Sequence, residues 1–404
     1  MPPDFYELIR RFEPAPLDGE MLRFYVKRYE PDNLFEKLVY EKIVKEGGNS
    51  RVFVVGSYGL GKSTFLNFWR KEMDIPYPRS PLEASMKKLI PIVVKTVYDD
   101  NPQKFLYNLL KGLEKGFKKP GWIYFVGMNQ EYEKFFKYIT QVVENVLMRF
   151  EKMGRVDLDT LKSALGFIVD NSNIPVIFMV DGFAYSESFE QLAFWFDNLL
   201  QGQGKVSFIF TIIPDHLNSF RTRFPHVVSK FIEIRIPGYN AEETKKVFSK
   251  RLKDFATPEN PFYPFKEEWI EEIWKHFPIL RDTIKVAQRA LTYAAKDGSL
   301  QKKHIELAIK EAERAMETTV LFELDELDRM ILKALAELGE AGPSDVTRWL
   351  KKQGYDVAKS TVHYRLKEPL LKKGLVEKTP SSRGKRRSKY RVGDKRLIEL
   401  LKYL

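Results

Sequence analysis

The sequence of 404 residues is long enough for roughly two to four domains, and its 44% hydrophobic and 14% aromatic residues can bury sizeable cores. The absence of cysteine excludes a disulfide framework, a thiolate metal site and a cysteine nucleophile, and it is compatible with a reducing cytosol. The N-terminus has no basic segment followed by an apolar one, and no uncharged apolar run approaches the roughly 20 residues that span a bilayer, so we expect a cytoplasmic protein without a membrane partner.

The net charge of +12 is concentrated near the C-terminus. Residues 341–404 hold 18 Lys and Arg against 6 Asp and Glu, whereas residues 1–340 hold 49 of each kind. A neutral body with one basic terminal module predicts an appendage that binds a polyanion, whereas an even spread of charge would have indicated only solubility. Nucleic acid is therefore the leading partner.

The first half of the chain alternates short apolar runs with helical patterns. Residues 1–48 form an N-terminal segment with a helical pattern over 33–46. β-rich runs follow at residues 51–55, 89–97, 175–180, 206–213 and 231–236, with helical patterns between them at 105–117, 132–153 and 158–169. This alternation predicts an α/β domain over 49–238, in which helices cover a parallel sheet.

Strand patterns disappear after residue 240. Helical patterns at residues 241–255, 267–276, 280–295 and 303–316 predict an all-helical lid domain over 239–321. Residues 322–404 then predict a separate small domain with three short helical stretches and two basic strands.

A glycine-rich loop with the spacing G-x-x-x-x-G-K-[ST] stands directly after the first predicted strand. It consists of Gly56, Ser57, Tyr58, Gly59, Leu60, Gly61, Lys62, Ser63 and Thr64, and a helical pattern begins there. The glycines permit backbone conformations that turn N–H groups toward phosphate oxygens, Lys62 can reach the outer phosphates, and Ser63 can ligate Mg2+. The strand–loop–helix setting disfavours the alternative, a glycine turn beside a surface lysine. We predict ATP and Mg2+ as cofactors.

A phosphate-binding loop of this kind also requires an acid that holds Mg2+ at the carboxyl end of a neighbouring buried strand. The apolar run over 175–180 ends in Asp181. We therefore predict that Ser63 and Asp181 are the metal ligands. The alternative is that Asp181 is only a turn residue that closes the strand before Gly182.

Together these features resemble the AAA+ ATPases. The loop, the strand-ending acid, the lid and the basic terminal domain are most similar to the archaeal branch of origin-recognition and replication-initiator proteins, which ends in a winged helix and opens its lid with a proline-tyrosine-acidic stretch like the one from Pro237. The resemblance covers most of residues 33–404. It implies an arginine finger at Arg221 or Arg223, a lid arginine that contacts the γ-phosphate at Arg281, and self-association or assembly with other AAA+ subunits. Solvated arginines and salt bridges within the lid are the alternatives.

Two positions depart from the pattern of that family. Gly182 stands where the family has a glutamate that orients the attacking water, and the polar sensor residue expected after the fourth strand has only Thr211 and Asp215 as substitutes. Both departures affect hydrolysis, while the residues for binding remain. Loss of a water-orienting group turns a cycling enzyme into a slow switch, with Glu187 and Glu190 as candidate replacements in the following loop.

The basic terminal domain has the pattern of a winged helix. Helical patterns at 327–338 and 343–354, and a third that starts at Ser360, precede a predicted hairpin of residues 374–379 and 389–392. In a helix-turn-helix, the second helix of the pair enters the major groove of DNA. The residues predicted to contact double-stranded DNA are Lys359, Ser360, Thr361, His363, Tyr364, Lys367, Arg383, Lys385, Arg386, Arg387 and Lys389. Lysine and hydroxyl side chains mostly grip phosphate, so no base preference is predicted. The alternative is a winged helix used for protein contacts.

The sequence thus predicts an ATP-binding AAA+ protein that engages duplex DNA through a C-terminal winged helix and hydrolyses ATP slowly, so that its nucleotide state controls geometry or assembly. Replication initiation or replicon maintenance is the expected setting. One alternative is a P-loop signalling or transcriptional switch ATPase, in which nucleotide exchange unmasks the winged helix. Another is a mobile-element ATPase that selects DNA targets. The missing glutamate argues against a motor helicase.

Overall fold

The computed structural model describes most of the chain. The described residues are 3–73, 91–117, 130–153, 156–172, 175–184, 186, 189–200, 205–322, 324–371, 375–379, 388–393 and 401. The chain divides into two compact units, Met1–His304 and Ile305–Leu404. The finer boundaries predicted after residues 48, 238 and 321 remain predictions. Within the described part of the chain, no helix is both long enough and apolar enough to cross a bilayer.

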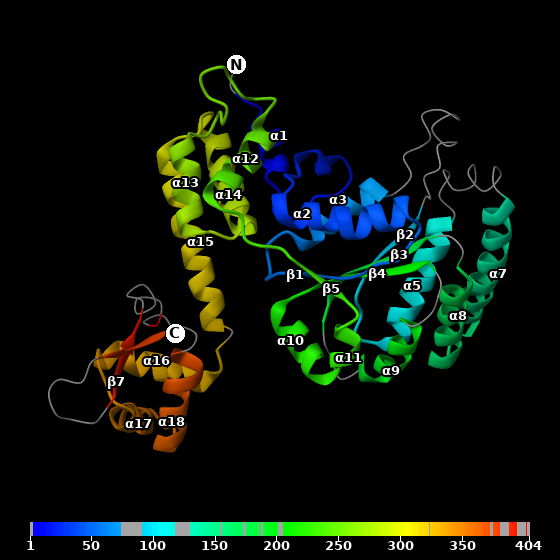
Figure 1. Ribbon diagram of the computed structural model, residues 1–404. Coiled ribbons are helices and arrows are strands. Elements are labelled where there is room, and N and C mark those ends of the chain that lie inside the picture. The colour runs from blue at the N-terminus through cyan, green and yellow to red at the C-terminus, as the bar shows by residue number, and fades with distance from the viewer. Residues whose placement is uncertain are drawn as a thin grey trace. The chain divides into compact units, whose positions relative to one another are not determined.

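The first unit is built on a five-stranded parallel sheet, which confirms the predicted fold class (Figure 1). Its strands are β1 (Arg51–Val55), β2 (Ile92–Val97), β3 (Val176–Phe183), β4 (Val206–Ile212) and β5 (Ile232–Arg235). Their order is β2-β3-β4-β1-β5, so β1 lies between the two strands that come last in the sequence. Ligands of open parallel sheets bind beyond the carboxyl ends of the central strands, which places the expected site after β1.

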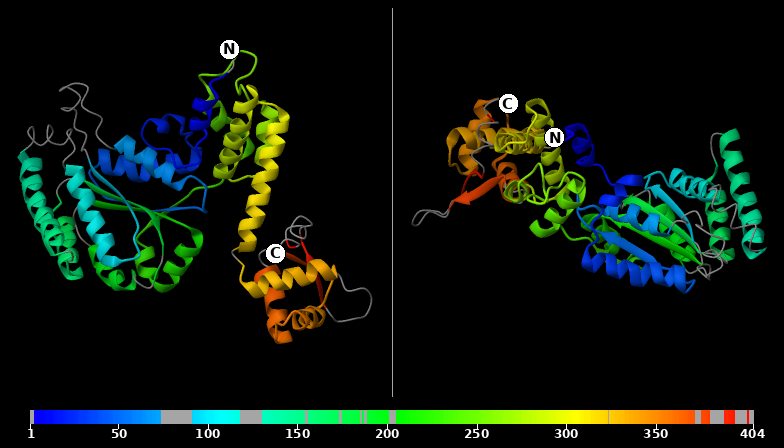
Figure 2. Two further views of the ribbon diagram at one scale, coloured as in Figure 1. Left: turned by 180° about the vertical axis from the view of Figure 1, so that it is seen from behind. Right: turned by 90° about the horizontal axis from the view of Figure 1, so that it is seen from above.

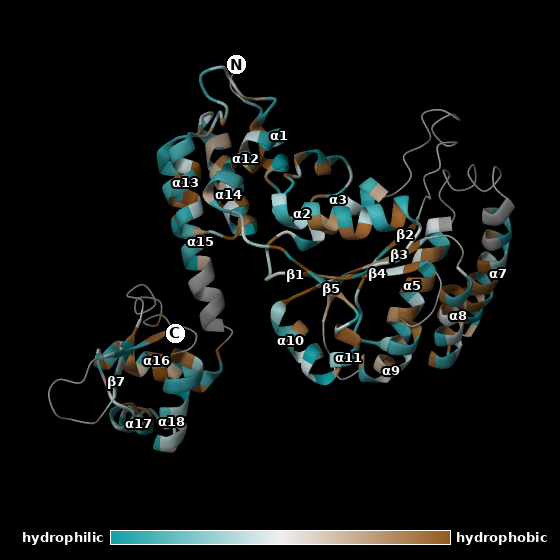
Figure 3. Ribbon diagram, viewed as in Figure 1, coloured by the Kyte–Doolittle hydropathy of each residue, from teal (hydrophilic) through white to brown (hydrophobic). Residues whose placement is uncertain are grey.

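Helices cover both faces of the sheet (Figure 2). One face packs on α5 (Pro102–Phe117), α7 (Gln130–Met153), α8 (Leu158–Asn171), α9 (Glu190–Leu199), α10 (Pro214–Arg223) and α11 (Pro225–Val228). The other face packs on α2 (Tyr29–Phe35), η2 (Glu36–Lys45) and α3 (Lys62–Met73). On β1, Phe53 and Val55 enter the first core, while Val52 and Val54 enter the second. Burial on both faces explains why the strands are hydrophobic along most of their length (Figure 3).

Helices of the predicted lid follow the sheet in the same unit. They are α12 (Ala241–Leu252), α13 (Glu267–His276), α14 (Leu280–Asp297) and the start of α15 (Lys302–Phe322). Asn240 caps α12, because its side chain accepts a hydrogen bond from the N–H of Glu243 at 2.8 Å while the Glu243 carboxylate accepts one from the N–H of Asn240 at 3.0 Å. This capping box fixes where the lid begins.

The N-terminal segment packs in two places. Helix α1 (Phe5–Arg11) joins the lid: the ring of Phe12 lies 5.0 Å from that of Phe248 and 5.6 Å from that of Phe265. The 3-10 helix η1 (Gly19–Phe24) and the residues around it pack instead on α3, where Tyr25 stacks on Phe68 at 4.4 Å. Residues 13–17 therefore connect the lid to the sheet domain a second time.

After the remainder of α15, the described residues of the second unit form three helices followed by two antiparallel strands. They are α16 (Glu326–Leu338), α17 (Pro343–Lys352), α18 (Lys359–Arg365) with its π-helical extension η4 (Leu366–Leu370), β6 (Val376–Thr379) and β7 (Lys389–Val392). Val346, Leu350, Val362 and Leu366 are buried in its own hydrophobic core. This order of elements is the one expected of a winged helix.

Candidate functional site

The glycine-rich loop lies between β1 and α3, where the fold predicts a ligand. Gly59 and Gly61 have φ angles of 78° and 85°, which residues with side chains rarely adopt. A side chain would also displace neighbouring atoms: a Cβ on Gly61 would lie 2.8 Å from Nη2 of Arg28, and one on Gly59 would lie 2.7 Å from Cγ2 of Ile279. Glycine is therefore required at both positions of a loop that opens at the positive end of α3.

The first residue of α3, Lys62, turns its ammonium group back into this loop. Its Nζ donates hydrogen bonds to the carbonyl oxygens of Gly56 at 2.6 Å and Ser57 at 2.9 Å. Burial lowers the pKa of Lys62, the carboxylate of Asp181 opposes that shift, and the charge of Arg281 adds to it. The ammonium group thus lies among backbone carbonyls and interacts with the charges of Asp181 and Arg281. The outer phosphates of a bound nucleotide would replace the carbonyls as its hydrogen-bond acceptors.

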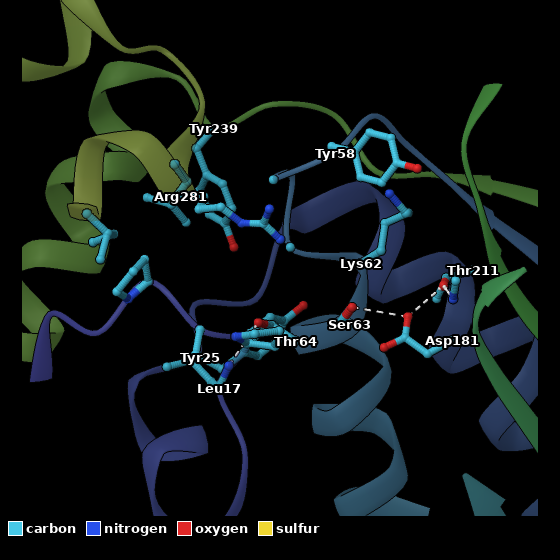
Figure 4. A pocket seen from close by; sticks show the side chains of 18 of the residues that line it. Leu17, Tyr25, Tyr58, Lys62, Ser63, Thr64, Asp181, Thr211, Tyr239 and Arg281 are labelled. Carbon is cyan, nitrogen blue, oxygen red and sulfur yellow. Dashed lines mark hydrogen bonds between the residues drawn. The ribbon is translucent and has the colours of Figure 1, made fainter. Parts of the chain in front are cut away.

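A pocket opens beside the loop, and its walls come from four parts of the first unit (Figure 4). They are the loop itself, residues between 13 and 28, the ends of β3 and β4, and lid residues between 239 and 284. Ser63 and Asp181 stand at one side of the pocket, while Leu17, Tyr25 and other largely apolar side chains enclose another. Such a combination suits a ligand with a charged end and a flat, less polar end.

Asp181 contacts two hydroxyl groups at the carboxyl edge of the sheet. Its Oδ1 accepts hydrogen bonds from Ser63 Oγ at 3.1 Å and from Thr211 Oγ1 at 2.7 Å (Figure 4). The N–H of Gly182 donates to the same Thr211 oxygen at 2.7 Å. Thr211, which the sequence offered as a substitute sensor, is therefore fixed directly against the predicted metal ligand.

A bulge in β3 produces this arrangement. Val180 pairs with Phe210 and Phe183 pairs with Ile212, so β3 advances three residues while β4 advances two. The extra residue lies at Asp181 and Gly182, and Gly182 has a φ of 72°. Bulges in parallel pairs are rare and commonly re-aim a side chain next to a functional site.

The donor set fits a magnesium ion. Ser63 and Asp181 offer a hydroxyl and a carboxylate oxygen, and Mg2+ is usually held by one or two protein oxygens together with phosphate oxygens and water. Among the described residues, no cluster of three or more His, Cys, Asp or Glu forms an all-protein metal cage. A metal at this edge would therefore depend on the nucleotide for its remaining ligands.

The comparisons with known proteins concern the fold of the chain. No model of a protein family matches the sequence, and no curated protein is similar enough to count as a relative. Among solved structures, the Aeropyrum pernix ORC2 protein with ADPNP and ADP is 19% identical with a TM-score of 0.59, over 98% of this chain and 96% of that one. The A. pernix ORC1 protein in complex with DNA is 14% identical with a TM-score of 0.57, over 97% and 95%. A Drosophila ORC structure bound to DNA is 12% identical with a TM-score of 0.52, over 100% and 92%.

The chain has the AAA+ fold of the origin-recognition proteins. That confirms the fold named by the resemblance in the sequence. The strand order, which the sequence did not predict, brings the loop after β1 next to the end of β4. At these levels of identity the likeness concerns the fold, so the roles of individual residues in this chain remain predictions.

The backbone at Gly182 limits how the missing glutamate can be restored. Its φ of 72° is unfavourable for any L-residue, although a Cβ there would meet no atom within 4 Å. We expect Gly182→Ala to lower the free energy of unfolding by about 1–2 kcal/mol, because alanine must adopt a left-handed conformation. Urea denaturation measures the loss. Gly166→Ala, in the interior of α8 with equal space around it, should instead raise stability by up to about 1 kcal/mol; equal effects of both variants would contradict the strained backbone.

The three predicted arginines lie in different surroundings. Arg281, in the first turn of α14, lines the pocket. It packs against the loop, since a Cβ added to Gly59 would lie 3.4 Å from the Cβ of Arg281. Arg221 and Arg223 end α10 and are exposed outside the pocket, and Arg221 is hydrogen bonded to Glu233. Of the three arginines, Arg281 lines the pocket and Arg221 and Arg223 do not, and their roles toward a nucleotide remain predictions.

Arg28 is a pocket residue that sequence reasoning missed. Its Nη2 donates to the carbonyl of Leu60 at 2.8 Å and its Nη1 to that of Pro237 at 3.3 Å, while its guanidinium lies 4.2 Å from the ring centre of Tyr239. It is buried and ties the glycine-rich loop to the linker that opens the lid. These contacts join residues far apart in the chain, so no local pattern could have indicated them.

Two further residues of the pocket were also missed. Arg251 on α12 is buried with its Nη1 hydrogen bonded to the carbonyl of Arg11, and burial lowers its pKa to about 10. His216, in the first turn of α10, lines the pocket, although the sequence shows it only as an isolated histidine. Asp215 beside it is exposed and does not line the pocket.

Six of the residues predicted to contact DNA lie on α18 and η4 of the second unit. Lys359, Ser360, Thr361, His363, Tyr364 and Lys367 are all exposed, while Val362, Leu366 and Leu370 are buried as the apolar spacing predicts. Lys389 begins β7 and forms an ion pair with Glu340 at 3.6 Å. Arg383, Lys385, Arg386 and Arg387 lie outside the described residues.

Proposed function

We propose that the protein binds ATP together with Mg2+ in the pocket after β1, and that its nucleotide state controls engagement of double-stranded DNA by the second unit. One observation carries the first part: a glycine-rich loop of fixed conformation opens on the N-terminus of α3, with Lys62 inside it and Ser63 against Asp181. That is the arrangement which binds phosphate and a phosphate-bound metal. The structure of the A. pernix ORC2 protein with ADPNP and ADP adds support by analogy of fold.

The proposal extends to DNA through the second unit, in which residues 341–404 hold 18 Lys and Arg against 6 Asp and Glu, and helix α18 has an exposed polar face. The A. pernix ORC1 and Drosophila ORC structures are complexes with DNA. Replication initiation or replicon maintenance is the setting that we propose. Measuring the affinity of the full chain for duplex DNA with ADP, with ATP and without nucleotide tests the coupling, and three equal affinities would contradict it.

A signalling or transcriptional switch is a second candidate, favoured by Gly182, because an ATPase without a water-orienting glutamate stays in one nucleotide state for a long time. Both candidate functions use the same nucleotide site, and they differ in the genomic DNA to which the protein would bind. Mapping its occupancy across the genome separates the two: occupancy at replication origins supports the first, and occupancy at promoters supports the second.

Within the pocket, the hydroxyl groups of Ser63 and Thr211 hold the Asp181 carboxylate in position, and the N–H of Gly182 donates to Thr211. Lys62 and Arg281 supply positive charge for the outer phosphates, and Arg28 fixes the loop against the lid linker. A bound Mg2+ would neutralise phosphate charge there. We therefore expect tight binding and turnover well below about 1 per second.

The residual turnover should depend on His216. It can accept a proton, and among the described residues that line the pocket it shares this property with Asp181 and Glu13. Glu190 starts α9 and is not one of the pocket residues, and Glu187 lies outside the described residues. We expect His216→Asn to slow single-turnover ATP hydrolysis by about 100-fold, the lower end of general base effects, with nucleotide affinity retained.

His226→Asn is the matched control for that substitution, since His226 is exposed on α11 outside the pocket. Release of labelled phosphate from preformed complexes measures the rate. A wild-type rate of several per second would contradict the expected slow turnover. An unchanged rate in His216→Asn together with a collapsed rate in Glu190→Gln would show that Glu190, and not His216, accepts the proton.

A further inference from the structure

A lysine on the strand next to β3 faces the predicted metal ligand. Lys95, on β2, has its Nζ 3.8 Å from Oδ2 of Asp181, and the side chains are only 18% and 15% exposed. The other carboxylate oxygen, Oδ1, already accepts hydrogen bonds from Ser63 and Thr211. The ammonium group therefore faces the oxygen that these two hydroxyl groups leave for other partners.

A chain of hydrogen bonds holds Lys95 in that place. Its Nζ donates to Oδ1 of Asn67, a buried residue of α3. Nδ2 of Asn67 in turn donates to the carbonyl of Leu17 at 2.8 Å, and the N–H of Leu17 donates to Oγ1 of Thr64 at 3.1 Å. Lys95 is thus held by residues of α3 and of the N-terminal segment, and it does not extend freely into solvent.

The consequence is that Lys95 and Asp181 together carry little net charge at the edge of the sheet where Mg2+ is predicted to bind. Gly182 supplies no second carboxylate, and the charge of Lys95 opposes that of Asp181 at a separation where unit charges interact strongly in a partly buried site. A divalent cation beside Asp181 would be repelled by the lysine. The same lysine would attract the phosphates of a nucleotide that arrives without its metal.

We propose that Lys95 takes over part of the charge of the metal ion, so that this protein binds ATP and ADP with only weak dependence on Mg2+. This inference rests on the nucleotide site proposed above and deepens it. Lys95 is a positioning residue in this role, because it acts through Asp181 and the local charge. Nucleotide state would then respond to the supply of ATP and ADP and little to free Mg2+.

Calorimetric titration of the full chain with ADP and with ATP, first with excess chelator and then with millimolar Mg2+, tests the proposal. For the wild type we expect the two conditions to differ by less than about tenfold in affinity, which is 1.4 kcal/mol. Lys95→Met should raise that ratio by about tenfold or more, because the repulsion is removed. Lys95→Arg keeps the charge and should behave as the wild type.

Lys104→Met is the matched control, since Lys104 forms a 2.6 Å ion pair with Asp99 and does not line the pocket. If Lys95→Met does not fold, Lys95→Gln replaces it, and the affinity for Mn2+ in the ADP complex, measured by electron paramagnetic resonance, gives a second readout that should rise by the same factor. A Lys95 variant that binds nucleotide with an unchanged metal dependence overturns the inference and leaves the proposed function intact. Loss of ATP binding in chelator with ADP binding retained also overturns it, because Lys95 would then be a ligand of the γ-phosphate. Failure of the wild type to bind any nucleotide refutes the proposed function itself.

Discussion

Lys62→Ala weakens the binding of ATP by at least about 100-fold. The Lys62 ammonium donates to two loop carbonyls at 2.6 and 2.9 Å, and outer phosphates would take their place. Each hydrogen bond to a charged group contributes roughly 1.5–3 kcal/mol, so the loss of two such bonds exceeds a factor of 100. Isothermal titration calorimetry with the full chain measures the change.

Lys71→Ala serves as the control for this experiment, because Lys71 is exposed on the same helix and its removal changes the net charge equally. ADP should be affected less than ATP if the ammonium serves the outermost phosphate. An unchanged ATP affinity in Lys62→Ala would refute the assignment of this pocket as the nucleotide site.

Neutralising Arg383, Lys385, Arg386 and Arg387 together weakens the binding of duplex DNA by about 100-fold or more, independent of sequence. These four residues are part of the charge excess of residues 341–404. For every phosphate that the variant no longer neutralises, the slope of log affinity against log salt concentration should become shallower by about 0.9. Fluorescence anisotropy of a labelled duplex across a salt series measures both quantities.

The matched control neutralises four exposed lysines of the lid, Lys246, Lys253, Lys285 and Lys296. It changes the net charge by the same amount and should leave the salt slope unaltered. Substitution of Tyr364, which is 60% exposed on α18, should alter sequence preference if its side chain reaches a base edge. An equal loss of affinity in both four-residue variants would show that the body of the protein binds DNA, and the second unit would then be assigned to protein contacts.

The fold was largely predictable because its signals are local. Helix α13 has the predicted bounds, and the five strands coincide with the apolar runs to within a few residues, since burial on both faces makes such strands continuously hydrophobic. The signal of the glycine-rich loop is equally local, because the positions of its glycines in the sequence determine where the backbone can adopt positive φ angles. The position of Asp181 beside the loop could be predicted because it ends an apolar run, and the carboxyl ends of neighbouring parallel strands lie at the same edge of the sheet.

The rest of the site depends on contacts that no window of sequence contains. Arg28 reaches the loop across 32 residues and the lid linker across 209, and Lys95 reaches Asp181 only because β2 pairs with β3 in one register. The positive φ of Gly182 comes from a bulge that the pairing of β3 and β4 creates. Sequence reasoning read Gly182 as a missing carboxylate, whereas the structure shows it also as a backbone requirement.

The second connection between lid and sheet domain has a mechanical consequence. The lid is joined to the sheet domain by the linker after Ile236, whose N–H donates to the carbonyl of Val55 at 2.7 Å, and by residues 13–17, which run from the lid-packed Phe12 to Leu17 on α3. A body tethered at one point can swivel in any direction, but one tethered at two points can turn only about the line through them. If the lid turns, these two connections would confine it to rotation about one line, and that rotation would change the separation between Arg281 and the glycine-rich loop.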